Sequence, residues 1–348
     1  MIRAHRTALA AATVWLAMAQ GGSKIHPGEV WLDTSGKPIQ AHGGGILLHD
    51  GVYYWYGEDK SLGNGNKVGV SCYSSRDLVN WKHESTALPK EAMPEEFRDN
   101  GICERPKVIY NSATHRFVMW MHLDNLGYRV SSAGIAVSET PTGPFHFERS
   151  FRPIKFDFGY LANDADQAEL GSTFRDMNLF VDDDGRAYVF YAAEGNPTMY
   201  VARLSADFTN VESPPVQGKT WNRILIGQSR EAPAPFRYKS TYYLITSGTS
   251  GWAPNAAGYA TATNILGPWT RQQNPCVGDG RDTTFDSQST FVLPAPGRPP
   301  GEFIYMGDRW FSNHLADSRY VWLPFKIEPD GSFHIAWSAE WEPAPTAR

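Results

Sequence analysis

An internal repeat constrains this sequence of 348 residues more than any other feature. Five segments share one form: a short β-rich run with adjacent aromatic residues, a polar gap, and a second β-rich run that ends at an aromatic residue or a turn. Equivalent points in the five segments follow one another at intervals of 54 to 71 residues, at Tyr54, Val118, Val189, Tyr243 and Ile304. Such repetition is typical of folds that arrange one supersecondary unit several times.

Each repeat has the pattern of a few antiparallel strands. Alternating apolar residues are bounded by turn signals such as "HDG" at 49–51, "DDDG" at 182–185 and "PDG" at 329–331, and no stretch shows a sustained helical period. Five units of about four strands each predict an all-β fold, a five-bladed β-propeller with its blades around a central channel. The alternative is a large β-sandwich whose strands resemble one another by chance.

Composition and charge limit the partners of this chain. With 41% hydrophobic residues the chain can bury a full core, and 13% aromatic residues suit a ring-lined binding site. The formal net charge is -5, and no basic stripe or polybasic tract is present. A nucleic acid or an anionic membrane surface is therefore not expected as a partner. The sequence leaves the oligomeric state open.

The amino terminus has the order of a secretory signal. Arg3 and Arg6 precede an apolar stretch from about Ala8 to Ala19, which ends in small residues. We expect residues 1–19 to be a cleaved signal peptide and 20–348 to form a single secreted or periplasmic domain. An uncleaved anchor or a buried helix is the alternative. No second apolar run approaches the roughly 20 residues that cross a bilayer, so no membrane association of the mature form is expected.

Three cysteines, Cys72, Cys103 and Cys276, can form at most one internal disulfide. Their spacing matches no zinc pattern, and we expect them to be buried small apolar residues. The "DDDG" run lacks the later ligands of a calcium loop and is predicted to be a hairpin turn. No ligand cluster is visible, so neither a metal nor a cofactor is predicted.

Polar residues recur where the innermost strand of each repeat begins. Glu104 opens the second repeat, Asp176 the third, Glu231 the fourth and Gln288 the fifth, whereas the first repeat has the glycine run Gly43–Gly45 there. In a propeller these positions converge on the channel. Carboxylates at one phase of several repeats are what acid–base catalysis requires, although any single one could be a solvated strand end.

These motifs resemble glycoside hydrolase family 43. An Asp ahead of the "DDDG" hairpin and "EAP" at 231–233 in the fourth repeat are similar to that family. Further stretches are more narrowly similar to its exo-β-1,3-galactanases: "AHGGGIL", "YYWYGEDK", "VSCYSSRDLVNW", "ERPKVIYN", "TSGWAPN", "SQSTF" and "YMGDRW". The resemblance runs from about Trp31 to Trp341.

The resemblance implies a secreted inverting exo-glycosidase that releases galactose from the non-reducing end of β-1,3-galactan, such as the backbone of arabinogalactan. It implies that Glu231 is the general acid and that Asp176 orients Glu231 and raises its pKa. A neighbouring carboxylate and partial burial have that effect on a carboxyl group. The alternatives are a related exo-glycosidase acting on galactofuranosides or arabinofuranosides, and a carbohydrate-binding propeller without activity.

The usual catalytic base of this family is missing. It is an Asp on the first strand of the first blade, where this sequence has His42 and Gly43. Glu104 could act as a carboxylate base, and Gln288 could hold and polarise the water, reacting as the imidic tautomer proposed at this position in the subgroup. His42 is a third candidate, although a histidine beside a glycine run is more often structural. We interpret Gly43–Gly45 as a vacated catalytic position.

The resemblance also implies which residues contact the sugar. Tyr128 and Trp252 would pack against the C–H face of the terminal galactose, and Asn196 and Thr249 would bind its hydroxyl groups. Two further tryptophans, Trp55 and Trp310, could belong either to the pocket or to the core.

Overall fold

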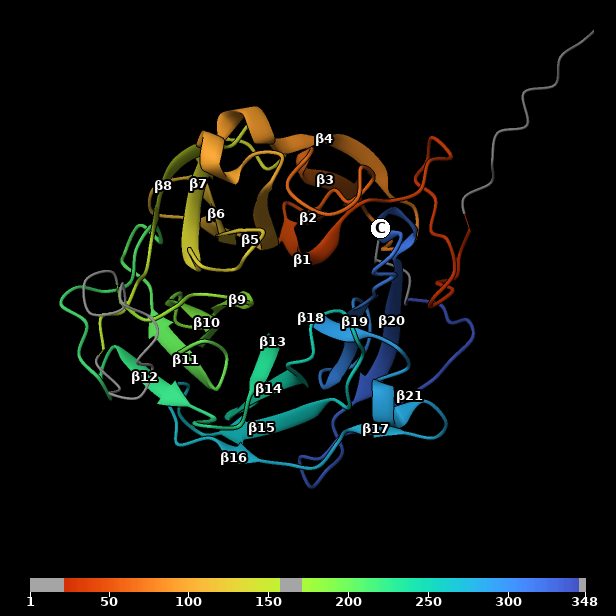
Figure 1. Cartoon of the computed structure of the whole chain (residues 1–348). Helices are drawn as coiled ribbons and strands as arrows, with labels where there is room; N and C mark the ends of the chain where they lie inside the picture. The colour runs from red at the N-terminus through yellow and green to blue at the C-terminus, as the bar shows by residue number, and fades with distance from the viewer. Residues whose placement is uncertain (1–21, 157–170, 344–348) are drawn as a thin grey trace, which may run out of the picture.

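The computed structural model describes residues 22–156 and 171–343. In these ranges the protein is a five-bladed β-propeller, and Figure 1 shows its five sheets in chain order around a central channel. The all-β fold class and the five blades are therefore confirmed. The predicted signal peptide, residues 1–19, lies outside the described residues.

Four blades are four-stranded antiparallel sheets. The first comprises β1 (His42–His49), β2 (Val52–Glu58), β3 (Gly69–Ser75) and β4 (Lys82–Pro89). The second comprises β5 (Gly101–Asn111), β6 (Arg116–Asn125), β7 (Ser132–Ser138) and β8 (His146–Phe151). The third comprises β9 (Met177–Val181), β10 (Ala187–Ala193), β11 (Thr198–Arg203) and β12 (Trp221–Ile224). The fourth comprises β13 (Arg230–Tyr238), β14 (Thr241–Gly248), β15 (Gly258–Ala262) and β16 (Thr270–Arg271).

The fifth blade differs from the expected four strands, because its sheet has three: β18 (Gln288–Pro294), β19 (Glu302–Arg309) and β20 (Arg319–Lys326). A separate parallel pair consists of β17 (Cys276–Val277) and β21 (Ile335–Ala336). The helices of the described ranges are four single 3₁₀ turns: η1 (Lys90–Ala92), η2 (Glu95–Phe97), η3 (Arg281–Thr283) and η4 (Leu315–Asp317). The absence of a helical period in the sequence agrees with this.

The repeat found in the sequence corresponds to one strand of each blade. All five equivalent points lie on the second strand, namely on β2, β6, β10, β14 and β19. The hydrophobic core is divided among the blade interfaces. Trp120 of the second blade, for example, shares a buried cluster with Tyr191 of the third. Each sheet therefore buries its faces against its neighbours, which explains why the strands contain so many aromatic residues.

Two smaller sequence predictions are also confirmed. Cys72, Cys103 and Cys276 are buried and unbridged. The "DDDG" run forms the turn between β9 and β10, in which Gly185 has a φ of 79° and its N–H donates to the Asp182 carbonyl oxygen over 2.9 Å. In the part of the chain that the structure describes, no helix has the length and apolar character needed to span a membrane.

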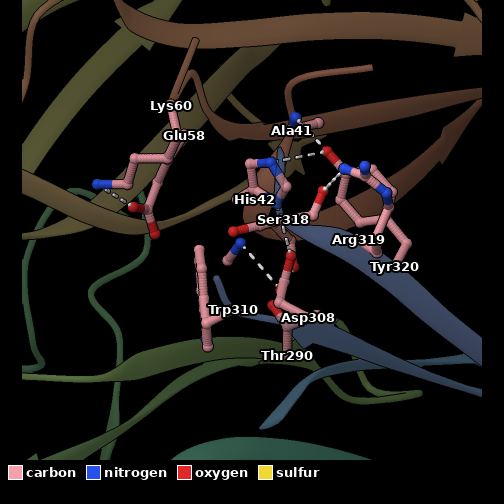
Figure 2. Close-up of polar contacts among 12 residues, drawn as sticks. Ala41, His42, Glu58, Lys60, Thr290, Asp308, Trp310, Ser318, Arg319 and Tyr320 are labelled. Atoms are coloured by element: carbon pink, nitrogen blue, oxygen red, sulfur yellow. Dashed lines mark hydrogen bonds and ion pairs between the residues drawn. The ribbon is translucent and has the colours of Figure 1, made fainter. Parts of the chain in front are cut away.

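The ring closes where the last blade meets the first. The segment ahead of β1 pairs with the end of the chain through a bridge between Ile25 and Trp341. Asp308 of β19 accepts a hydrogen bond from the backbone N–H of Gly43 over 3.0 Å, and its Oδ1 lies 3.1 Å from Nδ1 of His42. Figure 2 shows this pair, with Trp310 on one side of the imidazole and Tyr320 on the other. Side-chain bonds thus join the first and last blades.

Three buried polar side chains cross the channel and connect the inner strands. Lys107 of β5 and Thr290 of β18 both donate to carbonyl oxygens of the Gly43–Gly45 run on β1, each over 2.6 Å. Asn178 of β9 donates to the carbonyl oxygens of Pro233 on β13 and of Thr290, each over 2.9 Å. All five inner strands are linked in this way, which holds fixed the strand ends that carry the polar residues.

Candidate active site

Three inner strands share one backbone irregularity where the polar residues lie. A β-bulge interrupts the pairing at His42–Gly45 in β1, at Glu104–Lys107 in β5 and at Glu231–Ala234 in β13. The second residue of each bulge is in the left-handed region, with φ values of 57°, 55° and 54° for Gly43, Arg105 and Ala232. A bulge re-aims the neighbouring side chain. The repeat therefore gives Glu104 and Glu231 equivalent positions, and in the first blade the equivalent residue is His42.

One pocket at the channel mouth contains eight of the residues that the sequence indicated. They are Glu104, Tyr128, Asp176, Asn196, Glu231, Thr249, Trp252 and Gln288. The structure thus brings the four candidate catalytic residues and the four candidate sugar-binding residues together. Six more residues complete the lining: Glu58, Arg105, His122, Arg175, Gly251 and Trp310.

Glu231 has the environment of a general acid. Burial raises the pKa of its carboxyl group to about 8, and the nearby Asp176 carboxylate adds to this effect. Gln288 Nε2 donates to Glu231 Oε1 over 2.9 Å, and Asn196 Nδ2 donates to Oε2 over 3.1 Å. The carboxyl group is therefore held in place and carries its proton at neutral pH.

Glu104 is held in the opposite protonation state. Burial by itself would raise its pKa, but hydrogen bonding and charge from His122, together with Lys60 and Tyr128, outweigh burial and lower the pKa to about 2. The Tyr128 hydroxyl donates to Oε1 over 2.7 Å, and Nδ1 of His122 lies 3.3 Å from Oε2. The pocket therefore contains one protonated and one ionised glutamate, which is the division of roles that an acid and a base require.

Asp176 and Gln288 lie beside the acid. Asp176 directly precedes β9, and its Oδ2 is 3.0 Å from Nη2 of Arg105. Gln288 is the first residue of β18, and its Oε1 accepts hydrogen bonds from the Arg105 guanidinium and from the Trp310 indole, the latter over 3.1 Å. Both side chains are thus held by neighbours from other blades.

The residues expected to contact sugar lie on the walls of this pocket. Trp252 and Trp310 form an edge-to-face pair with ring centroids 5.1 Å apart. The buried Oδ1 atom of Asn196 has no hydrogen-bond partner among the described residues, so it is free to accept a bond from a sugar hydroxyl. Of the two tryptophans left open by the sequence, Trp310 lines the pocket and Trp55 lies in the core.

The sequence of the blades that build this pocket matches a known family. The sequence model of glycosyl hydrolases family 43 matches residues 44–290, which is most of the chain. The chain belongs to glycoside hydrolase family 43.

Solved family 43 structures resemble the whole propeller. A family 43 β-1,3-galactosidase bound to galactodeoxynojirimycin is 40% identical, with 91% of this chain and 100% of that chain covered and a TM-score of 0.82. The Clostridium thermocellum exo-β-1,3-galactanase is 38% identical, with coverages of 93% and 68% and a TM-score of 0.83. The Phanerochaete chrysosporium exo-β-1,3-galactanase, solved as a glutamate-to-alanine variant with β-1,3-galactotriose, is 36% identical, with coverages of 92% and 68% and a TM-score of 0.78. The search of curated proteins returned no match.

In this family 43 protein His42 is enclosed by its neighbours. Its ring is fully buried, stacks on Tyr320 at 4.8 Å between centroids, and does not line the pocket. Nδ1 of His42 lies 3.1 Å from Oδ1 of Asp308 (Figure 2). The structural interpretation of His42, which the sequence favoured, agrees with this geometry.

Gly43 leaves room for a side chain of the neighbouring strand. A Cβ atom there would lie 2.2 Å from Oε1 of Glu58, and φ is 57°. Glu58 comes from β2, lines the pocket, and forms a buried ion pair with Lys60 over 2.8 Å. The space beside Gly43 is therefore partly filled by a carboxylate from the next strand, which the sequence analysis missed.

The side chains of Glu104, His122 and Asp176 offer ligand atoms within 4.8 Å of one another, close enough to be examined as a cation site. Burial tends to lower the pKa of His122, but its hydrogen bond to Asp124 and the Glu104 carboxylate 3.3 Å away raise it to about 9. In the structure His122 pairs with Glu104 and Asp124, and Asp176 pairs with Arg105. The absence of a required metal stays a prediction.

Arg105 and His122 were also missed by the sequence analysis. Arg105 stands directly after Glu104, and nothing in its local pattern distinguishes it from a solvated arginine. His122 lies on the second strand of the second blade, opposite Glu104 in the register. Only that pairing, which depends on the position of the bulge, could have indicated that His122 contacts the site.

Proposed function

We propose that this family 43 enzyme removes galactose from the non-reducing end of β-1,3-galactan with inversion of the anomeric configuration. One observation carries the proposal: the buried Glu231, whose pKa is raised to about 8, lies at the channel mouth in one pocket with Asp176, Gln288 and Glu104, whose pKa is lowered to about 2. Solved relatives that are 36–40% identical are described as β-1,3-galactosidases or exo-β-1,3-galactanases, and one was solved with β-1,3-galactotriose. Their ligands support a galactan substrate.

Glu231 protonates the leaving oxygen, because it is the carboxyl group that keeps a proton at neutral pH. Asp176 raises the proton affinity of Glu231 through its negative charge, and Asn196 and Gln288 orient the carboxyl group. Trp252 and Tyr128 provide faces for the C–H side of the sugar, and Thr249 and Asn196 bind hydroxyl groups.

The attacking water must lie on the opposite face of the sugar from Glu231. In inverting enzymes the acid and the base are roughly 6.5–9.5 Å apart to leave room for this water. Glu104 is ionised and could accept the proton directly. In the structure Gln288 hydrogen-bonds to Glu231 itself, so it reaches the water only if its side chain turns away when substrate enters. Both residues remain candidates for activating the water.

Galactose release from β-1,3-galactan by the wild type and by Glu231→Gln tests the proposal. We expect the wild type to release galactose whose first-formed anomer is α by proton NMR, and the variant to be almost inactive. No release by the wild type, or equal activity of the two, would contradict it. Parallel assays on galactofuranosides and arabinofuranosides test the furanosidase alternative.

Separate replacements of the two candidate bases then distinguish them. If Gln288→Ala keeps full activity while Glu104→Gln loses it, Glu104 activates the water; the reverse result assigns the role to Gln288. We also propose that the enzyme is secreted or periplasmic, on the basis of its amino-terminal sequence. Sequencing of the amino terminus of the exported protein checks whether cleavage occurs near Gln20.

A further inference from the structure

Arg105 contacts more of the proposed catalytic groups than any of the residues that the sequence indicated. Its side chain is buried, and its guanidinium donates to Gln288 Oε1 and, over 3.1 Å, to the Ser289 carbonyl oxygen. Nη2 of Arg105, which donates to Gln288, also lies 3.0 Å from Asp176 Oδ2. One side chain from the second blade therefore reaches the third and fifth blades, and both contacts are made to residues beside the acid.

The position of Arg105 is itself held by the backbone. Arg105 is the left-handed residue of the β5 bulge, and its N–H donates to Glu58 Oε1 over 2.9 Å. A non-glycine residue in this region is strained, and such strain persists only where surrounding contacts enforce it. The bulge that points Glu104 into the pocket also directs the following side chain across the channel.

The contacts of Gln288 determine which way its amide faces. Oε1 receives one hydrogen bond from Arg105 and a second from Trp310, over 3.1 Å for the indole. Arginine and the indole nitrogen can only donate, and an amide oxygen has two lone pairs. If the amide were flipped, its NH₂ group would face two donors. Nε2 therefore faces Glu231, to which it donates over 2.9 Å.

We propose that Arg105 is a positioning residue of the reaction: with Trp310 it fixes the Gln288 amide against Glu231, and with its second contact it holds the Asp176 carboxylate beside the same acid. This inference rests on the proposed function. Arg105 acts through these partners and needs no contact with the sugar. A charged hydrogen bond at Oε1 also draws electron density away from the amide nitrogen, which strengthens its bond to Glu231.

The charge of Arg105 has a second, measurable consequence. It opposes Asp176, because the cation lowers the pKa of Glu231 while the carboxylate raises it. Removing the cation therefore shifts the alkaline limit of activity to higher pH. An arginine whose charge does not act on Glu231 would leave this limit unchanged, so the pH profile reports the charge of Arg105, and the fall in kcat below this limit, where Glu231 keeps its proton, reports its positioning role.

The test compares Arg105→Met, Arg105→Lys and Trp310→Phe with the wild type in kcat, KM, pH profile and melting temperature. We expect kcat to fall about 100-fold in Arg105→Met and about tenfold in Trp310→Phe, since misplaced catalytic groups lose factors of this order. Arg105→Lys, which keeps the charge but not the fork, should recover part of kcat and the wild-type alkaline limit.

Arg237→Met is the matched control. Arg237 also lies on an inner strand, β13, but its ion pairs are with Asp182 and Asp183 outside the pocket. The kcat of Arg237→Met and the alkaline limit of its activity should equal those of the wild type. If Arg105→Met fails to fold, Arg105→Lys and Trp310→Phe still carry the test. An active wild type with kcat and alkaline limit unchanged in the Arg105 variants would overturn the inference, whereas an inactive wild type would instead contradict the proposed function.

Discussion

The first and fourth blades begin with the same backbone and use it differently. His42 and Glu231 each precede a left-handed residue in a β-bulge, with φ values of 57° at Gly43 and 54° at Ala232. Glu231 lines the pocket, whereas His42 is buried against Asp308 and Tyr320. Glu231 therefore lies in the proposed active site, whereas the equivalent residue, His42, joins the first and last blades.

The difference shows that the bulge sets the direction of a side chain but not its role. In the fourth blade the neighbours are Gln288 and Asn196, which leave the carboxyl group open to the pocket. In the first blade the neighbours come from the last blade and enclose the ring. A propeller has to close its ring somewhere, and in this protein the closure includes His42 and Gly43, which contact Asp308 and Tyr320.

Exchanging the two polar groups for amides tests this comparison most strongly. We expect Glu231→Gln to lower kcat by about 10³-fold and to leave the melting temperature nearly unchanged, because the amide keeps the shape but not the proton. His42→Gln should do the reverse, with a clearly lower melting temperature and nearly normal kcat per folded molecule. Large loss of kcat in a fully folded His42→Gln would show that His42 takes part in catalysis.

The left-handed residues give a second matched pair. Gly43→Ala should destabilise the fold by about 2–4 kcal/mol, since the new Cβ meets Glu58 and the φ is unfavourable. Ala232→Gly should be neutral or slightly stabilising, because it relieves the same strain in the fourth blade. Urea unfolding measures both. If both substitutions changed the free energy of unfolding by the same amount and in the same direction, the two bulges would not be equivalent.

The pH dependence of activity should report the environment of Glu231. The pKa is raised to about 8, so kcat/KM should fall as the pH rises through about 8 and the acid loses its proton. The raised pKa also links folding to pH: relative to an unfolded glutamate with a pKa of 4.5, the protonated form favours folding, and this contribution is present in full below about pH 4.5 and is lost as the pH rises from there to about 8. In Asp176→Asn the charge that raises the pKa is gone, and the alkaline limit should move to lower pH. An unchanged limit would exclude Asp176 as its modulator.

The smallest expected effect concerns Tyr128. Its hydroxyl is one of several groups that lower the pKa of Glu104, the others being His122 and Lys60. Tyr128→Phe removes one hydrogen bond to a charged group, worth about 1.5–3 kcal/mol at most. We expect kcat/KM to fall several-fold, with Glu104 still ionised at neutral pH. A loss as large as that of Glu231→Gln would place Tyr128 in the proton transfer itself.

Local patterns in the chain were sufficient for the strands, the five repeats and the polar positions Glu104, Asp176, Glu231 and Gln288, because hydrophobic alternation and turn residues depend only on near neighbours. The four sugar-binding residues and the roles of Glu231 and Asp176 came from resemblance. Arg105, His122 and Glu58 could not be found in this way, since each acts through contacts with other strands or other blades.

Tertiary structure decided the protonation of the two glutamates and the use of His42. Glu104 and Glu231 occupy equivalent bulges, yet one pKa is about 2 and the other about 8. The difference arises because an imidazolium lies beside Glu104 and a carboxylate beside Glu231. Periodicity along the chain specifies where a side chain points, whereas its charge state depends on the groups that the closed ring brings within a few ångströms.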